Sequence, residues 1–173
     1  YNRDSREHTF KLFQDNGNPI YTISFGIEGA QGIEDLGTVH IELFDKVCPQ
    51  ACRNFSLLCS GTPIPGMGYS KFSYKNCPVH RLVRNGWIQT GDVVDGSGRN
   101  SVCAFGAEET VPDESFSVDF GFQHGGIVGY ANNGAHGSRS QFFITLGPND
   151  WMNHKFQGFG RVIQGLRTIH AFN

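Results

Sequence analysis

The chain has 173 residues, of which 38% are hydrophobic, and its 14 Lys and Arg nearly balance 16 Asp and Glu to give a net charge of −2. This length suits one domain with one core. The charge balance argues against nucleic acid or an anionic membrane as partner, and no apolar run reaches the roughly 18 residues that cross a bilayer. We therefore predict a globular domain, monomeric by default, with no nucleic-acid or membrane partner.

The cysteines indicate a reducing environment rather than a disulfide framework. Their number is odd and their spacing irregular, at positions 48, 52, 59, 77 and 103, which favours a cytoplasmic, or else nuclear, location. Cys48 and Cys52 lie four residues apart, but no second pair is present to complete a zinc site. We expect ordinary thiols and no bound metal.

Strand patterns fill the N-terminal part of the chain. With 23 Gly and 15 Phe, the composition favours many turns around an aromatic, β-rich core. Apolar and polar residues alternate as in half-buried strands, and Asn16-Gly17 suits a type I′ hairpin turn. We predict strands at residues 8–15, 21–27 and 37–44. Residues 1–18 are thus predicted to be an extension with its own hairpin strand, ahead of a single domain at 19–173.

Two helices and further strands are expected in the rest of the chain. Pro49 suits the first position of a helix that ends at Gly61. Strands are predicted at residues 79–83, 87–89, 127–131 and 141–146, and a second helix at 161–172, with Val162, Leu166 and Ile169 on one face. Two helices and about eight short strands predict a barrel with helical caps.

Two segments of the chain carry a series of short motifs: HR at 80–81, QTGD at 89–92, ANNG at 131–134, SQFFIT at 140–145, Trp151, and FGRV at 159–162. In order and in spacing, without gaps inside either segment, they resemble the cyclophilin-type peptidyl-prolyl cis-trans isomerases. Because the chain resembles this family over most of its length, we expect a mostly β fold, an eight-stranded closed antiparallel β-barrel capped by two α-helices. The family's final strand is missing from this chain, and we expect residues 8–15 to cover part of that edge. The resemblance also implies a shallow groove for an extended X-Pro peptide, with no cofactor and no metal.

Isomerisation of an X-Pro peptide bond needs no nucleophile. Resonance in the amide creates a barrier of ~18–20 kcal/mol, and a fixed cation that favours the twisted amide over the planar one lowers it. Arg81 is the candidate cation, because its guanidinium stays charged and offers several donors. Without its motif, an arginine on a strand would be a solvated surface charge.

The remaining roles follow from the resemblance alone. It implies that Gln89 orients Arg81 and that Asn132 holds the peptide backbone through main-chain groups. It further implies contacts of the bound peptide with Ala131, Gln141, Phe143, Trp151 and Met152, the last three around the proline ring. From the residues alone, Phe143 and Met152 would be core, and His80 a structural histidine.

Three positions depart from the family pattern. Gly86 and Trp87 stand where the family has Phe and Met in the pocket wall, and Phe156 where it commonly has His. Loss of the Phe ring removes roughly 1.5–3 kcal/mol of apolar burial against proline, while Trp87 either refills or blocks the pocket. We therefore expect weak or absent catalysis, with weak binding of cyclosporin-like cyclic peptides. The alternatives are an active isomerase with altered substrate preference, for which Arg84 adds a charge near the pocket, and a protein-interaction scaffold.

Overall fold

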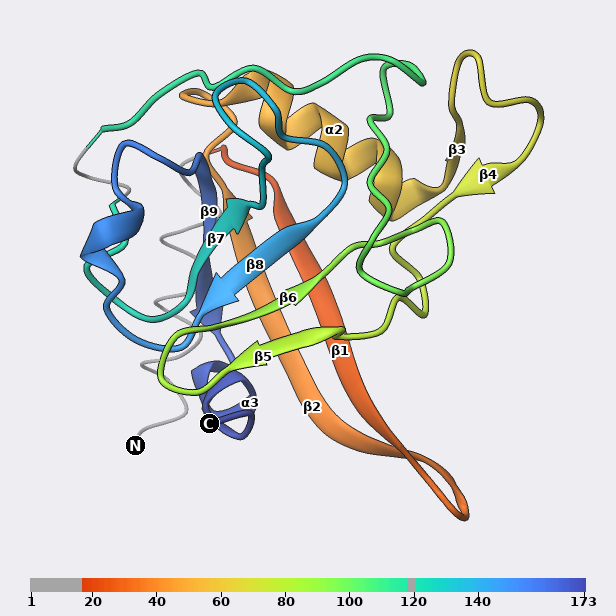
Figure 1. Ribbon diagram of the computed structural model, residues 1–173. Helices are drawn as coiled ribbons and strands as arrows, with labels where there is room; N and C mark the ends of the chain where they lie inside the picture. Colours follow the sequence, from red (N-terminus) through yellow and green to blue (C-terminus); the bar gives the residue numbers. More distant parts are fainter. Residues whose placement is uncertain (1–16, 118–120) are drawn as a thin grey trace.

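The described part of the computed structural model, residues 17–117 and 121–173, is built on one antiparallel seven-stranded sheet. The order of its strands is β1-β2-β9-β7-β8-β6-β5 (Figure 1). Their bounds are β1 Ile20–Gly29, β2 Gly32–Leu43, β5 Arg81–Val83, β6 Trp87–Thr90, β7 Ile127–Tyr130, β8 Phe142–Thr145 and β9 Gly158–Gln164. A separate two-stranded ribbon pairs β3 (Thr62–Pro63) with β4 (Lys71–Phe72).

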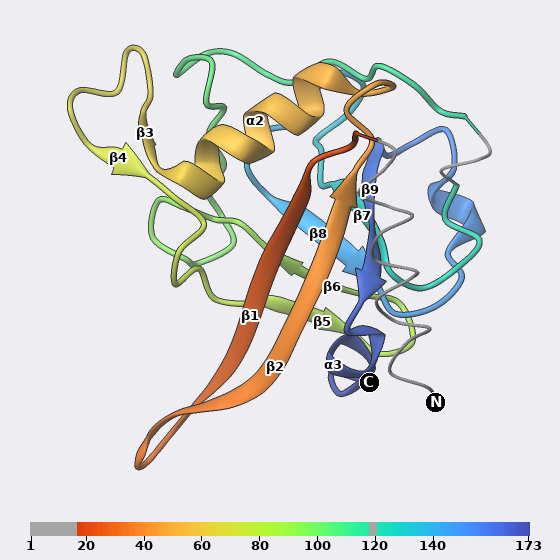
Figure 2. The ribbon, with the colours of Figure 1, turned by 180° about the vertical axis from the view of Figure 1, so that it is seen from behind.

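The sheet curls into a half-barrel and does not close (Figures 1 and 2). Among the described residues β1 pairs only with β2, and β5 only with β6, so these two strands are its edges. The predicted mostly β fold with two helices is confirmed. The predicted eight-stranded closed barrel is not, because the described residues form a seven-stranded half-barrel with an open seam. The predicted strand at residues 8–15 lies outside the described residues.

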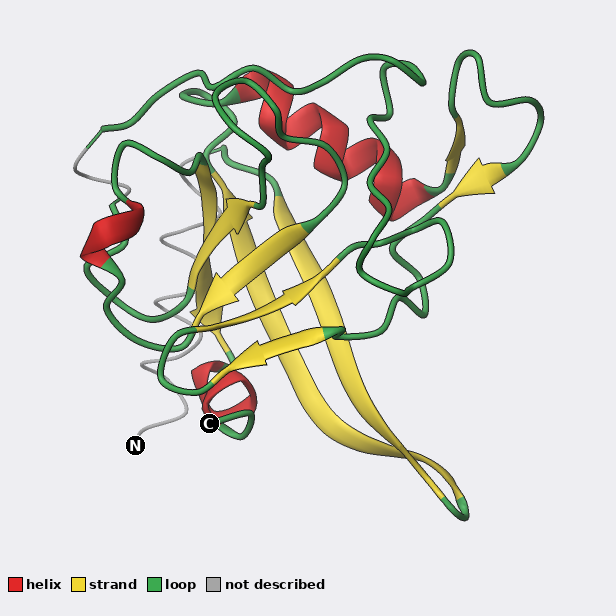
Figure 3. Ribbon diagram, viewed as in Figure 1, coloured by secondary structure: helices red, strands yellow, loops and turns green. Residues whose placement is uncertain are grey.

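Helices cover the two ends of the half-barrel, as Figure 3 shows by colour. Helix α2 (Pro49–Ser60) lies across one end and α3 (Leu166–His170) at the other. At the first end, Phe55 of α2 packs edge-on against Phe142 with ring centroids 5.3 Å apart. At the second, Phe172 packs against Phe25 at 5.3 Å. No helix of the described segments is long and apolar enough to span a bilayer.

Helix α2 begins and ends where the sequence predicts. Pro49 occupies its first turn, and Gly61, at φ 76°, ends it by donating its N–H to Leu57. The N-terminal N–H groups are capped from a distance, because the Glu114 carboxylate accepts hydrogen bonds from the N–H groups of Gln50 (3.0 Å) and Ala51 (2.9 Å). A carboxylate here also complements the helix dipole.

The predicted helix at residues 161–172 is wrong in its first third. Gly158–Gln164 form strand β9, which pairs with β2 on one side and β7 on the other. Hydrogen bonding along both edges outweighs the helical spacing of three apolar side chains. Gly165, at φ 88°, then turns the chain, and only Leu166–His170 is helical.

Candidate functional site

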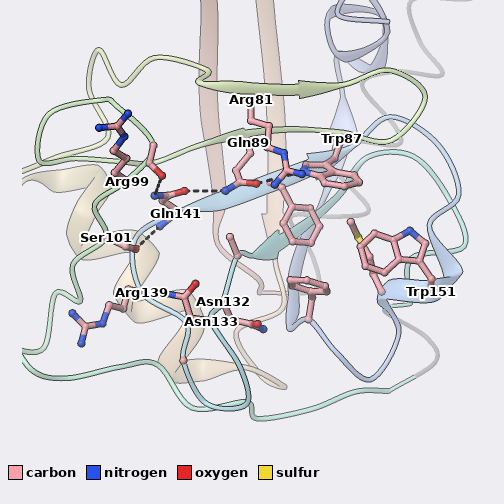
Figure 4. Close-up of a pocket in the computed structure, with 16 residues that line it drawn as sticks. Arg81, Trp87, Gln89, Arg99, Ser101, Asn132, Asn133, Arg139, Gln141 and Trp151 are labelled. Atoms are coloured by element: carbon pink, nitrogen blue, oxygen red, sulfur yellow. Dashed lines mark hydrogen bonds between the residues drawn. The ribbon is translucent and has the colours of Figure 1, made fainter.

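A single groove of about 360 Å³ gathers every site residue predicted from the sequence (Figure 4). It lies over β5, β6 and β8 and is completed by the loops on either side of β8. Its predicted members are Arg81, Trp87, Gln89, Ala131, Asn132, Gln141, Phe143, Trp151, Met152 and Phe156. The sequence therefore identified residues that are far apart in the chain and adjacent in space, while their individual roles stay predictions.

One end of the groove is aromatic. Side chains alternate along β8, so that Phe142 faces the main core and Phe143 a second apolar cluster with Phe122 and Met152. Phe143 is only 2% exposed and Met152 1%. The Phe156 ring packs against this cluster, with its centroid 5.7 Å from that of Phe143.

Two further aromatic side chains border the same end. Trp151 is 52% exposed and comes from a 3₁₀ helix, Asp150–Met152. Its ring lies 5.9 Å from that of Phe156, edge to face, and 5.9 Å from that of Trp87. A ring floor with tryptophan borders fits a small apolar ring such as that of proline.

Arg81 lies on the exposed edge strand β5 and contacts Trp87 of β6. Its guanidinium carbon is 5.2 Å from the Trp87 ring centroid, a cation–π contact. The register pairs Arg81 with Gln89 across the two strands, but no hydrogen bond joins their side chains in the described structure. Instead the Trp87 indole N–H points at Gln89 Oε1, with a nitrogen–oxygen distance of 3.4 Å. Here, Trp87 rather than Gln89 contacts the Arg81 cation.

The Trp87 side chain forms part of the groove wall and does not fill the pocket. It is half-buried, packs against the Phe143 cluster, and still lines the groove. The tight turn before it leaves no room for a larger residue, because a Cβ on Gly86 would lie 2.8 Å from Val83 Cγ1. The Trp87 indole thus supplies aromatic surface beside Gly86, where the residue itself has no side chain.

Gln141 forms the polar floor at the centre of the groove, and its side-chain amide makes four hydrogen bonds. Oε1 accepts from Gln89 Nε2 (2.9 Å) and is 3.1 Å from His80 Nε2. Nε2 donates to the carbonyl oxygens of Gly98 (3.0 Å) and Asn100 (2.8 Å). Because the amide is fully used, Gln141 positions Gln89 and the loop after β6. His80 is half-buried beside it, and its structural role stays a prediction.

Ala131 and Asn132 both line the groove, and Figure 4 shows Asn132 on the side opposite Arg81. The Ala131 N–H donates to the Gln141 carbonyl oxygen at 3.0 Å. The Asn132 side chain donates to the Lys155 carbonyl oxygen (2.9 Å) and accepts from the Gly134 N–H (3.2 Å). The Asn132 side chain is therefore engaged within the protein, and contact of its main chain with a peptide stays a prediction.

Six lining residues were missed by the sequence analysis: Gly98, Arg99, Ser101, Asn133, Gly137 and Arg139. All come from loops, where no periodic pattern indicates direction. One signal was present, since Asp92 is followed by a glycine-rich stretch that suits an acceptor surrounded by backbone donors.

The loop after β6 is built around Asp92, which is 1% exposed. Its carboxylate accepts from the backbone N–H groups of Val94, Asp95, Gly98 and Asn100. Burial alone would raise the pKa of Asp92, but these hydrogen bonds outweigh it and lower the pKa to about 2. Gly98 is required in this loop, because its φ is +81° and an added Cβ would clash with the His80 ring.

The chemistry of the lining is that of a cation beside an apolar pocket. No His, Cys, Asp or Glu is among the described residues that line the groove. Nor do three or more such residues gather anywhere in the described segments in a way that would hold a metal ion. The arrangement suits recognition of an extended peptide and stabilisation of charge on its backbone.

Comparisons with known proteins agree with this geometry. The family model "Cyclophilin type peptidyl-prolyl cis-trans isomerase/CLD" matches residues 30–173. The human and bovine proteins named "Probable inactive peptidyl-prolyl cis-trans isomerase-like 6" are 34% and 33% identical to the chain, over 98% and 95% of it and 52% and 51% of their own lengths. An Arabidopsis thaliana protein named as a peptidyl-prolyl cis-trans isomerase is 35% identical over 79% of the chain and 59% of its own length. The chain spans about half the length of the first two relatives.

Proposed function

Because the chain belongs to the cyclophilin-type peptidyl-prolyl cis-trans isomerase family, we propose that its groove binds X-Pro peptides and isomerises them weakly or not at all. The observation that carries this proposal is the convergence of the Arg81 cation and the Phe143 pocket on one groove. The proline ring would lie on Phe143 and Met152, bordered by Trp151. The peptide backbone would then run past Arg81 on one side and Asn132 on the other.

The contacts of Arg81 support the low turnover. Catalysis of bond rotation requires the guanidinium to interact more strongly with the twisted amide than with the planar one. In this chain the guanidinium already contacts the Trp87 ring, and an exposed contact of this kind is worth about 0.5–1 kcal/mol. The substrate would have to displace or share it. The absent side chain at Gly86 further reduces the apolar surface available to proline.

An active isomerase with altered substrate preference is the second candidate. It is favoured by the Arabidopsis thaliana relative, which is named as an isomerase without the word inactive. Its identity to this chain is 35% over 79% of it, against 34% over 98% for the human protein. A pure interaction scaffold is the third, and it would require Trp87 to exclude proline from the pocket. The open groove beside Trp87 favours the first two over the scaffold.

Isomerisation and binding measured on the same peptides separate these candidates. We expect proline peptides to bind more tightly than peptides with alanine in place of proline, with turnover close to the uncatalysed rate. Arg81→Ala should abolish whatever turnover remains. Arg84→Ala is the matched control. The sequence suggested a charge near the pocket at this position, but Arg84 is exposed in the turn after β5 and is not among the residues lining the groove. Fast turnover would establish the second candidate, and equal binding of the proline and alanine peptides would establish the scaffold.

The proposal also covers a class of weaker ligands, the cellular location and the oligomeric state. Cyclosporin-like cyclic peptides are proposed as weak ligands, since Trp151 remains exposed at the pocket border. A cytoplasmic or nuclear location and a monomeric state are also proposed. All five cysteines are free, and burial raises the pKa of the Cys48 thiol to about 12, which suits unreactive thiols in a reducing compartment.

A further inference from the structure

Positive charge gathers in the groove at the end opposite Trp151. The lining includes three arginines, Arg81, Arg99 and Arg139, and no Asp or Glu. Arg99 comes from the loop between β6 and β7 and Arg139 from the loop between β7 and β8, and Figure 4 shows both on the side away from Trp151. In a chain with a net charge of −2, this is a local separation of charge.

Neither of the two loop arginines is neutralised by a carboxylate. The ion pairs of the described residues are His136–Asp113 and Arg161–Glu42, and both lie outside the groove lining. Arg139 makes one side-chain hydrogen bond, from Nη1 to the Ala107 carbonyl oxygen at 3.3 Å. A guanidinium has five N–H donors, so most of those on Arg139 remain for a ligand. Arg99 is exposed, and no described residue is bonded to its side chain.

The nearby carboxylates are engaged elsewhere. Asp92 and Asp95, in the loop of Arg99, accept hydrogen bonds from backbone N–H groups of that same loop. Glu108 and Glu109 follow Ala107 in the sequence, but neither lines the groove and neither forms an ion pair with a described residue. An anionic ligand would therefore meet no ion pair of Arg99 or Arg139 with a described residue that it must first break.

Buried hydrogen bonds fix the backbone that carries these arginines. Asn54 of α2 is fully buried and donates to the Arg139 carbonyl oxygen at 3.0 Å, while accepting from the Ala104 N–H at 2.8 Å. Ser101 Oγ accepts from the Ser140 N–H at 3.0 Å, joining the two loops. The two guanidinium groups thus extend from a rigid frame.

We propose that this arginine end selects peptides that carry an anionic side chain, a carboxylate or a phosphate, a few residues from the proline. Arginine suits both, because its planar fork binds either anion through two parallel hydrogen bonds. The inference rests on the proposed function, since the proline must occupy the Phe143 pocket while the anion reaches Arg99 and Arg139. It adds a requirement on sequence that the aromatic pocket alone does not impose.

The test uses labelled peptides with a central proline and one variable residue two or three positions to either side. That residue is Glu or Gln, or phosphoserine or serine, and the dissociation constants are measured by fluorescence anisotropy. We expect the Glu peptide to bind about three- to tenfold more tightly than its Gln partner on one side of the proline, and the phosphoserine peptide to gain at least as much. The ratio of the dissociation constants of the neutral and the charged peptide should fall toward one in about 0.5 M salt.

Charge reversal locates the effect. Arg99→Glu is expected to remove most of the gain, and Arg139→Glu the remainder. Arg99 is exposed, so its variant remains informative if Arg139→Glu fails to fold. Arg84→Glu makes the same change of charge outside the groove and should keep the gain.

The possible outcomes distinguish failure of the anion preference from failure of the proposed proline-peptide binding. Proline peptides that bind better than alanine peptides, but with a gain below about twofold, would overturn the anion preference and leave proline binding intact. A gain that survives replacement of proline by alanine, or that Arg84→Glu removes equally, would indicate adsorption to general surface charge and would also overturn it. Failure of every peptide to bind would reject both proposals. A gain from phosphoserine alone would assign phosphate as the anion.

Discussion

Phe143 and Met152, at the aromatic end of the groove, are almost completely buried and belong to an apolar cluster, whereas Arg99, at the other end, is exposed on a loop. Ring contacts hold the first end, and backbone hydrogen bonds to Asp92 and Asn54 hold the second. The difference teaches that one end is fixed by the folding of the core and the other by a few polar groups. Stability should therefore depend on the first end and charge selectivity on the second.

Removing the central ring of the aromatic end should have the largest effect. Phe143→Ala deletes a side chain that is 2% exposed and contacts both Phe122 and Phe156. We expect a loss of about 3–5 kcal/mol in the free energy of unfolding, measured by urea denaturation. Trp151→Ala, at the exposed border, should cost far less stability and still weaken proline-peptide binding. A loss below about 1 kcal/mol for Phe143→Ala would contradict the assignment of this end to the core.

Removing the Asp92 carboxylate, which holds the loop that carries Arg99, should have a smaller effect on stability, and this effect should depend on pH. The pKa of Asp92 falls from 3.8 to about 2 on folding, which corresponds to about 2 kcal/mol at roughly 1.4 kcal/mol per pH unit. Because this pKa is lowered, the stabilisation is complete above about pH 4 and is lost as the pH falls through 2. Asp92→Asn should therefore destabilise the protein by about 2 kcal/mol near pH 7, and progressively less toward pH 2, as denaturation at several pH values would show. A penalty that is constant with pH would mean that Asp92 acts through packing instead.

Arg81 lies between the aromatic end and the arginine end of the groove. Removing its contact with Trp87 should raise the isomerase activity. Trp87→Met removes the ring that contacts Arg81, a contact worth about 0.5–1 kcal/mol. If that contact restrains the guanidinium, the isomerisation rate should rise about two- to fivefold in a coupled assay on an X-Pro peptide. A higher KM at unchanged kcat would show instead that Trp87 serves as pocket wall, and would favour the active-isomerase alternative.

The smallest effect should come from replacing Lys155, a cation beside the aromatic end of the groove. Lys155 Nζ lies 5.9 Å from the Trp151 ring centroid and is not among the residues lining the groove. Lys155→Gln should change the preference for a Glu peptide over a Gln peptide by less than about twofold. A loss as large as that in Arg99→Glu would mean that the anion is read beside the aromatic pocket.

The sequence predicted those parts of the fold that local chemistry decides. Pro49 and Gly61 set the ends of α2, and alternation placed β1 and β2. It failed at β9, where pairing on both sides overrode a helical spacing, and Gly160 lies so close to Glu42 that a Cβ there would be 2.8 Å from its carbonyl oxygen. Such approaches depend on distant segments and leave no local pattern.

The candidate site divides in the same way. The predicted residues lie on strands and in loops alike, and they were predictable because the family motifs place them. Arg99 and Arg139 were not, because each sits in a loop whose path depends on buried acceptors and donors such as Asp92 and Asn54. The contact between Arg81 and Trp87 was also missed, since Trp87 lies outside the motifs that carry the resemblance.

The four hydrogen bonds of Gln141 have a thermodynamic consequence for binding. A flipped amide would set its NH2 group against donors and its oxygen against two carbonyl groups, so the side chain has one orientation before any ligand arrives. The centre of the groove thus loses little conformational entropy on binding, whereas an exposed arginine such as Arg99 has about 2 kcal/mol of rotamer freedom to lose. Calorimetry should accordingly find that an anionic peptide binds with a more favourable enthalpy and a less favourable entropy than its neutral partner.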